Sequence, residues 1–167
     1  MKQAKVQDIY NLSPMQQGML FHTLCAPKSG IYLQQFSWTL QGKIDASKLK
    51  QAWQKVVNRH PILRTAFYWE NLEQPYQVVY DQVEFPWDEQ DWCQLSQQSQ
   101  REQLETFLKV DQERGFNLSE APLMRLAWIR LSEDTSQIVW SYHHLLLDGW
   151  SLSLVFKEVL SFYEALC

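Results

Sequence analysis

Residues 141–151 read SYHHLLLDGWS, and this stretch decides how the rest of the chain is interpreted. Two adjacent histidines end an apolar, β-branched run and are followed by three leucines and an Asp-Gly pair. Neighbouring residues of a strand face opposite sides, so we expect one of His143 and His144 to point inward and the other outward. An imidazole presented at a strand end can act as a base, because its unperturbed pKa lies near neutral pH.

Asp148 and Gly149 complete the stretch. The carboxylate could orient an imidazole, or it could pair with an arginine as a structural ion. Gly149 allows a positive φ or a close backbone approach, and the free N–H groups of a helix that begins beyond it suit an anion. This combination fits acyl transfer, although a structural histidine and a plain Asp-Gly turn are the simpler interpretations. A metal site built from His143, His144 and Asp148 is disfavoured because neighbouring strand histidines diverge.

Length and composition narrow the class of protein. The 167 residues are 46% hydrophobic, enough for one domain with a core, and the net charge of -4 argues against a nucleic-acid binder. No glycine-rich phosphate loop follows a strand and no G-x-S-x-G elbow occurs, so nucleotide binding and serine hydrolysis lack support. Three scattered cysteines, no signal peptide in residues 1–17 and no apolar run of membrane-spanning length predict a cytoplasmic protein without membrane contact.

The hydrophobic periodicity outward from this stretch predicts alternating helices and strands. One helix is expected to begin at Ser13-Pro14, a second at Asp45 and to end before Pro61, a third to span 96–112, and a fourth to begin at Ser151. The expected strands are 31–40, 63–69, 76–80, 123–131 and 136–142. No pattern assigns the acidic, aromatic residues 81–92. The order predicts an α/β (α+β) single domain over residues 1–167, with a mixed, largely antiparallel sheet flanked by helices.

Three segments resemble the motifs of nonribosomal peptide synthetase condensation domains. Residues 143–149, HHLLLDG, match the HHxxxDG signature; residues 12–24, LSPMQQGMLFHTL, resemble the first motif; residues 59–67, RHPILRTAF, resemble the second, RHxxLRTxF. Their order and spacing agree with the family, and related CoA-dependent acyltransferases carry HxxxDG. The resemblance covers essentially the whole chain and implies a chloramphenicol acetyltransferase-like lobe.

A full domain of this family is a V-shaped pair of such lobes with the active-site tunnel between them. This sequence resembles the N-terminal lobe, and the second-lobe motifs, including a DFGWG-type segment, are missing. We therefore expect residues 1–167 to be an N-terminal lobe (subdomain) whose C-terminal lobe is absent. The isolated lobe should be inactive, and apolar surface that the C-terminal lobe normally covers would favour self-association.

The resemblance also implies an activity and roles for individual residues. Condensation domains form an amide bond between a donor acyl or peptidyl thioester and an acceptor aminoacyl thioester. Each thioester is held on the phosphopantetheine arm of a donor or acceptor peptidyl carrier protein. The resemblance implies that these arms are substrates and that no cofactor or metal is bound directly. His144 is implied to be catalytic, by removing a proton from the amine or by positioning it. Asp148 is implied to be structural and paired with Arg64, His143 to be structural, and Gly149 to leave room for the substrate arms.

Two other functions stay open. One is a non-catalytic module of the same fold that docks a carrier protein or another partner; the other is a freestanding CoA-dependent acyltransferase that acts as an oligomer. Gly18 stands where the commoner first motif has arginine, a variant that resembles chain-elongating domains following an epimerising module, so a D-configured donor is an expectation. The intact HHxxxDG disfavours a heterocyclisation domain, which carries DxxxxD, and the HHLLLDGWS ending disfavours an epimerisation domain.

Overall fold

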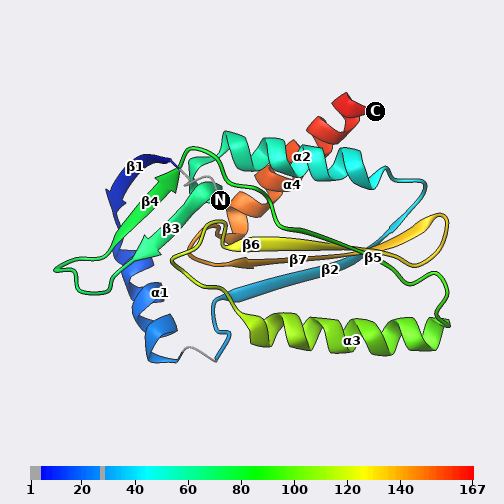
Figure 1. Ribbon diagram of the computed structural model, residues 1–167, viewed down its shortest axis with the longest axis horizontal. Helices are drawn as coiled ribbons and strands as arrows, with labels where there is room; N and C mark the ends of the chain where they lie inside the picture. Colours follow the sequence, from blue (N-terminus) through cyan, green and yellow to red (C-terminus); the bar gives the residue numbers. More distant parts are fainter. Residues whose placement is uncertain (1–4, 27–28) are drawn as a thin grey trace.

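A four-stranded sheet sandwiched between helices forms the main body of the protein (Figure 1). The computed structural model describes residues 5–26 and 29–167, so the first four residues of the stretch inspected for a signal peptide lie outside it. The sheet has the order β2 (Leu33–Gln41), β7 (Thr135–His143), β6 (Met124–Arg130) and β5 (Trp87–Asp91). All neighbours are antiparallel except β5 and β6, which are parallel.

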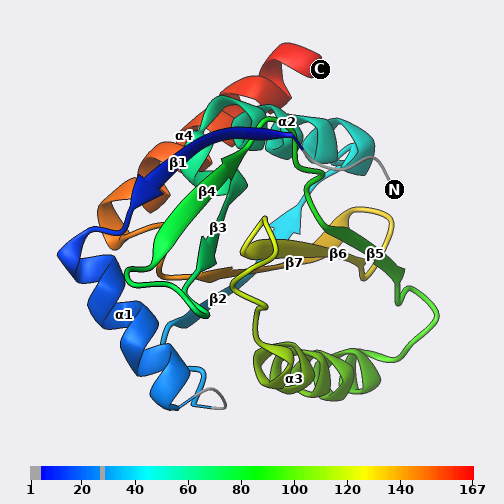
Figure 2. The same ribbon diagram turned by 60° about the vertical axis from the view of Figure 1, so that its left-hand side comes forward.

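A smaller sheet lies beside the main one (Figure 2). It has the order β1 (Val6–Asn11), β4 (Tyr76–Tyr80) and β3 (Thr65–Tyr68), with antiparallel pairing throughout. Helix α1 (Pro14–Cys25) follows β1, and a short 3₁₀ turn, η1 (Pro61–Arg64), leads into β3. The two sheets and α1 converge near the end of β7, where the histidine pair lies.

The helices begin where local chemistry favours them. Ser13 caps α1 by accepting from the Gln16 N–H, while the Gln16 side chain accepts from the Ser13 N–H; this capping box satisfies two N–H groups that the helix leaves free. Asp45 caps α2 (Ala46–Arg59) with its own side chain, which accepts from the Lys48 N–H. Helix α2 then buries one stripe of side chains: Leu49, Ala52, Trp53, Val56 and Val57.

The two faces of the main sheet bury different helices. Helices α2 and α4 (Gly149–Leu166) cover one face, where Trp140 and Tyr142 of β7 join the large apolar core with Trp53. Helix α3 (Gln97–Arg114) covers the other face, over Val139 and its neighbours. Alternate β7 residues face opposite layers, so Ser141 lies on the α3 face with Val139. This alternation determines how the strand end presents its histidines.

The structure confirms the predicted fold class and most elements. The predicted strand 63–69 is shorter, because Pro61–Arg64 form the turn η1 and β3 spans Thr65–Tyr68. Three further differences concern whole elements or their starts. Strand β1 is not predicted by the sequence pattern, because all six of its residues are exposed and carry no buried stripe. Residues 87–91, which no pattern assigns, form the parallel edge strand β5. The last helix begins at Gly149 with Asp148 as its cap, two residues earlier than the predicted start at Ser151. No helix in the described part of the chain is long and apolar enough to cross a membrane.

Candidate active site at the end of β7

The histidine pair lies where β7 leaves the sheet. His143 pairs with Leu33 in the β2–β7 ladder, and the N–H of His144 extends that ladder by donating to the Tyr32 carbonyl at 2.8 Å. His143 is 5% exposed, whereas His144 is half-buried. The prediction that one imidazole faces inward and the other outward is therefore confirmed, with His144 as the outward one.

One ring nitrogen of His144 is fixed by the loop that follows it. Its Nδ1 lies 2.6 Å from the carbonyl oxygen of Leu147. A carbonyl oxygen only accepts, so Nδ1 carries the proton and Nε2 of the neutral ring keeps its lone pair. The part of the chain that the structure describes offers Nε2 no hydrogen-bond partner. His144 thus presents a free base nitrogen at a half-exposed position.

The three leucines of the motif explain how the loop stays in place. Leu145, Leu146 and Leu147 are 3%, 6% and 4% exposed and belong to the main core. The Leu146 N–H also closes a turn on the His143 carbonyl at 3.0 Å. Buried leucine side chains are each worth about 2 kcal/mol of burial, so the carbonyl that holds His144 Nδ1 is itself anchored.

His143 has the opposite tautomer and a structural environment. The Leu145 N–H donates to its Nδ1 at 3.2 Å, which leaves the proton on Nε2, 3.5 Å from the Thr23 hydroxyl of α1. Burial, with a smaller contribution from the neighbouring His144, lowers the pKa of His143 to about 4. A ring that stays neutral at physiological pH and has both nitrogens engaged is suited to hold the loop, in line with its predicted structural role.

Asp148 and Gly149 serve the start of α4. Asp148 Oδ1 accepts from the Ser151 hydroxyl at 2.7 Å and from the Ser151 N–H at 2.9 Å, and these bonds lower the pKa of the carboxyl group. The carboxylate therefore occupies the helix N-terminus that the sequence offered to an anion. Gly149 is the first helical residue and does not have the positive φ that the sequence allowed; a Cβ there would meet no atom within 4 Å. Within the described residues, no segment approaches Gly149 closely enough to require glycine.

The predicted Arg64–Asp148 ion pair is wrong. Arg64 is 4% exposed and donates to the carbonyls of Val57 (3.1 Å), Asp81 (3.1 Å) and Tyr80. The guanidinium of Arg64 thus donates to free backbone carbonyls near the ends of α2 and β4. Asp148 is exposed and already accepts hydrogen bonds within α4. Spacing in the sequence did not show that free carbonyls would surround this side chain. Both residues have structural contacts, but not with each other.

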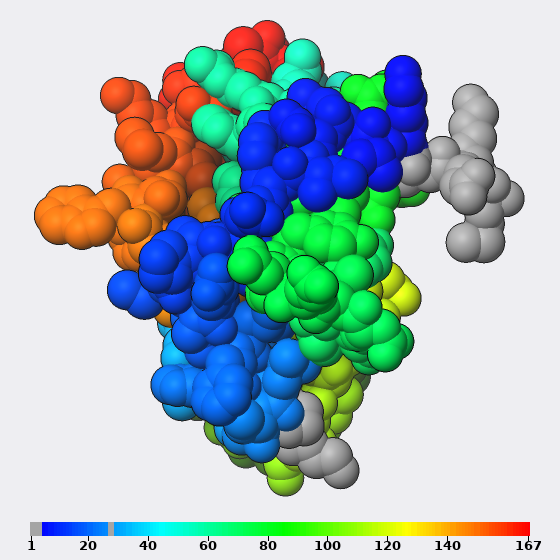
Figure 3. Space-filling model, turned by 90° about the vertical axis from the view of Figure 1, so that its left-hand side faces the viewer, coloured from blue at the N-terminus to red at the C-terminus, as the bar shows by residue number. Residues whose placement is uncertain are grey.

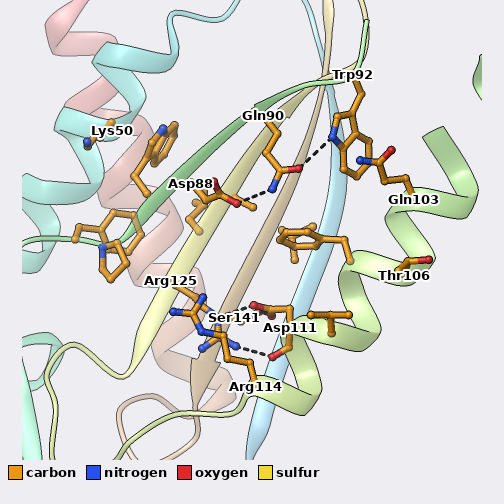
Figure 4. Close-up of a pocket in the computed structure, with 18 of the residues that line it drawn as sticks. Lys50, Asp88, Gln90, Trp92, Gln103, Thr106, Asp111, Arg114, Arg125 and Ser141 are labelled. Carbon is orange, nitrogen blue, oxygen red and sulfur yellow. Dashed lines mark hydrogen bonds and ion pairs between the residues drawn. The ribbon is translucent and has the colours of Figure 1, made fainter. Parts of the chain in front are cut away.

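A large cavity lies away from the histidines, between α3 and the main sheet (Figure 4). It holds about 660 Å³ and is lined by side chains of α3, β5, β6 and β7, with none of the HHxxxDG residues among them. At one end Asp111 accepts from Arg125 Nε at 2.5 Å and from the Ser141 hydroxyl at 2.5 Å. Sequence reasoning missed this network, although an aspartate four residues after Phe107, on the inward stripe of α3, was a usable signal.

Several large apolar side chains of α1 and of the start of α4 are exposed. Trp150 at the start of α4 is 87% exposed, and Met15 and Phe21 of α1 are 73% and 63% exposed. Figure 3 shows α1 and the start of α4 on the same face of the molecule, next to the β3–β4 hairpin. Large exposed apolar side chains on neighbouring elements are typical of a surface that another protein body covers.

Comparison with known proteins places the chain in a family. A family model described as Condensation domain matches residues 6–167. A linear gramicidin synthase of Brevibacillus parabrevis is 48% identical over 158 residues, which cover 95% of this chain and 2% of that protein. Tyrocidine synthase 2 of Brevibacillus parabrevis is 38% identical over 162 residues, covering 97% of this chain and 4% of that protein.

Solved structures confirm the predicted chloramphenicol acetyltransferase-like fold. The starter condensation domain of rhizomide synthetase RzmA superimposes with a TM-score of 0.84 at 21% identity, over 96% of this chain and 40% of that one. A four-domain nonribosomal peptide synthetase bound to AMP and glycine gives a TM-score of 0.84 at 20% identity, over 98% of this chain and 12% of that one. The chain thus spans less than half of each of these proteins.

Proposed function

Because this chain belongs to the condensation-domain family of nonribosomal peptide synthetases, we propose that it is the N-terminal lobe of a domain that joins two carrier-bound substrates through an amide bond. The donor is an acyl or peptidyl thioester and the acceptor an aminoacyl thioester. Each is held on the phosphopantetheine arm of a peptidyl carrier protein. A cytoplasmic location stays a prediction.

The proposed reaction balances without a metal or a redox partner. The acceptor amine attacks the donor carbonyl carbon, so that a C–N bond forms and the C–S bond of the donor thioester breaks. The donor arm leaves as a thiol, and the proton that the amine loses balances the thiolate. A base next to the amine, or a group that positions it, is the protein's main contribution.

His144 is the residue that we propose for this task. The observation that carries the proposal is its unengaged Nε2, on a ring whose Nδ1–H is held by Leu147 at 2.6 Å. The nitrogen suits either role, as proton acceptor from the amine or as the group that positions it. His143, with both nitrogens engaged and a pKa near 4, is unsuited to accept a proton from the amine.

A second lobe is proposed to complete the site. The chain spans 40% of the rhizomide starter condensation domain that shares its fold. Trp150 at the start of α4, with Met15 and Phe21 of α1, are exposed apolar side chains, and we propose that the second lobe covers part of this apolar surface. The reacting thioesters would then meet between the lobes, shielded from water that would otherwise hydrolyse them.

The test is formation of the peptide bond between loaded carriers. The 167-residue chain alone and the same chain joined to a C-terminal lobe of the family are each mixed with a donor-loaded and an acceptor-loaded carrier protein, and the dipeptidyl product is measured by mass spectrometry. We expect product only from the two-lobed protein. Carrier binding without product from the two-lobed protein would instead favour the docking module, and product from the single lobe would overturn the need for a second one.

A further inference from the structure

We propose that Tyr32 is a positioning residue for His144 and that His22 of α1 holds Tyr32 in place. The proposal rests on the proposed function, because it assigns a residue to the same site. Tyr32 lies just before β2, more than a hundred residues from the histidine pair along the chain. It belongs to none of the three motifs that resemble the family.

Three of the four histidines of the chain surround the Tyr32 ring. The ring centroid lies 6.2 Å from that of His143, 6.5 Å from that of His144 and 6.3 Å from that of His22. The His22 ring is stacked at 20°, whereas the other two are tilted by 52° and 58°. The phenol ring therefore lies near the His22 ring of α1 and near both rings of the histidine pair.

Tyr32 acts on His144 through both backbone and side chain. Its carbonyl accepts the His144 N–H at 2.8 Å, which fixes where the backbone of His144 leaves the sheet. The phenol ring is tilted by 58° to the half-buried imidazole of His144, with 6.5 Å between the two ring centroids, and the described hydrogen bond of that imidazole is made through Nδ1. The bond to Leu147 sets the tautomer, and we infer that the Tyr32 ring sets the direction of Nε2.

Helix α1 contacts both Tyr32 and the histidine segment. The Tyr32 hydroxyl lies 3.1 Å from His22 Nδ1, and the next residue of α1, Thr23, reaches His143 at 3.5 Å. Nearer the start of the helix, Gln16 Nε2 donates to the Leu145 carbonyl at 3.4 Å. Helix α1 therefore contacts Leu145 near its start, and Tyr32 and His143 near its end. Such a helix can hold the tyrosine and the histidine loop in a fixed position relative to each other.

The experiment compares variants that keep or remove each contact. Tyr32→Phe and His22→Phe each remove the hydroxyl–imidazole bond and keep a ring, and the double variant removes the same single bond. Tyr32→Ala removes the ring as well. Tyr10→Phe is the matched control, because it removes an exposed tyrosine hydroxyl whose one hydrogen bond among residues 5–26 and 29–167 is to Asp8, at 2.6 Å.

Two measurements are made on each variant. In the two-lobed protein, kcat and KM for the loaded carriers are determined. In the 167-residue chain, the ¹⁵N shifts of the His144 ring report the proton on Nδ1, independently of any activity. We expect kcat to fall about threefold to tenfold in Tyr32→Phe and His22→Phe, no further in the double variant, and more in Tyr32→Ala, with KM unchanged.

The outcomes separate the two proposals. A two-lobed protein with no condensation activity refutes the proposed function, while the ¹⁵N measurement still tests the position of His144. In Tyr32→Ala the imidazole can turn away from the Leu147 carbonyl and lose its Nδ1 bond, so we expect the His144 shifts to move toward a mixture of tautomers, and to stay unchanged in Tyr10→Phe. Parental kcat together with parental His144 shifts in Tyr32→Ala would overturn the role of Tyr32.

Discussion

Acid should destabilise this fold partly through His143. Burial and the neighbouring His144 lower the pKa of His143 from 6.5 in the unfolded chain to about 4 in the folded one. Between these values the unfolded state binds the proton more readily, so folding stability falls as pH falls. The stability that depends on a neutral His143 ring is fully present above the pKa of the unfolded chain, 6.5, and is lost as the pH falls to the pKa of the folded chain, about 4.

The size of the effect follows from the two pKa values. Integrating the proton linkage from roughly pH 7.5 down to about pH 5 gives a loss of about 2 kcal/mol from this one side chain. Below about pH 4 the contribution levels off, because both states are then protonated. The total is about 3 kcal/mol, a large share of the marginal stability of a domain of this size.

The assay is urea unfolding of the parent chain and of His143→Gln at several pH values. Glutamine cannot titrate, and its side-chain oxygen can accept the Leu145 N–H that His143 accepts at 3.2 Å. The difference between the two free energies of unfolding isolates His143 from all other titrating groups. We expect that difference to shrink by about 2 kcal/mol on acidification to about pH 5; a difference that stays constant with pH would refute the reasoning about the buried neutral ring.

Three substitutions test the structural contacts that the site depends on. Asp148→Ala should lower Tm by about 2–4 °C while Asp148→Asn, which can still cap α4, leaves it nearly unchanged; equal losses in both, measured calorimetrically, would point to an ion pair after all. Arg64→Ala should cost about 3 kcal/mol in urea unfolding because buried carbonyls lose their donor; a neutral result would contradict that role. Asp111→Ala should cost about 3–5 kcal/mol because Arg125 is left without its carboxylate, and the double change with Arg125→Met should recover part of the loss.

The parts of the fold that the sequence predicts are those with a clear apolar pattern. The one-sided stripe of α2 that ends in Val57 identifies the helix and its buried face, and the apolar run of β7 identifies a strand that is buried on both faces. Strand β1 has no such pattern, because it is held to β4 by backbone pairing while all its side chains are exposed. Strand β5 pairs in parallel with β6 across a long connection, a relation that local periodicity does not contain.

The sequence predicts how the two histidines are oriented but not which groups Arg64 and Asp148 contact. The alternation along the strand places one histidine outward and one inward, and the structure shows that His144 is the outward one. The ion pair of Arg64 with Asp148 follows from the family resemblance and their opposite charges, but exposed Asp148 finds a nearer partner within its own helix. The contact of Tyr32 with the histidine pair depends on the β2–β7 register and on the approach of α1, which only the folded chain brings together.

The central claim is that the free Nε2 of His144 performs or positions the step that joins the two substrates. Its most direct test is single-turnover condensation by the two-lobed protein carrying His144→Ala, with circular dichroism to establish that the fold is kept. We expect the rate of product formation to fall by about 10²–10⁴-fold with the carriers still bound. Condensation at the parental rate in a folded His144→Ala variant would contradict the claim.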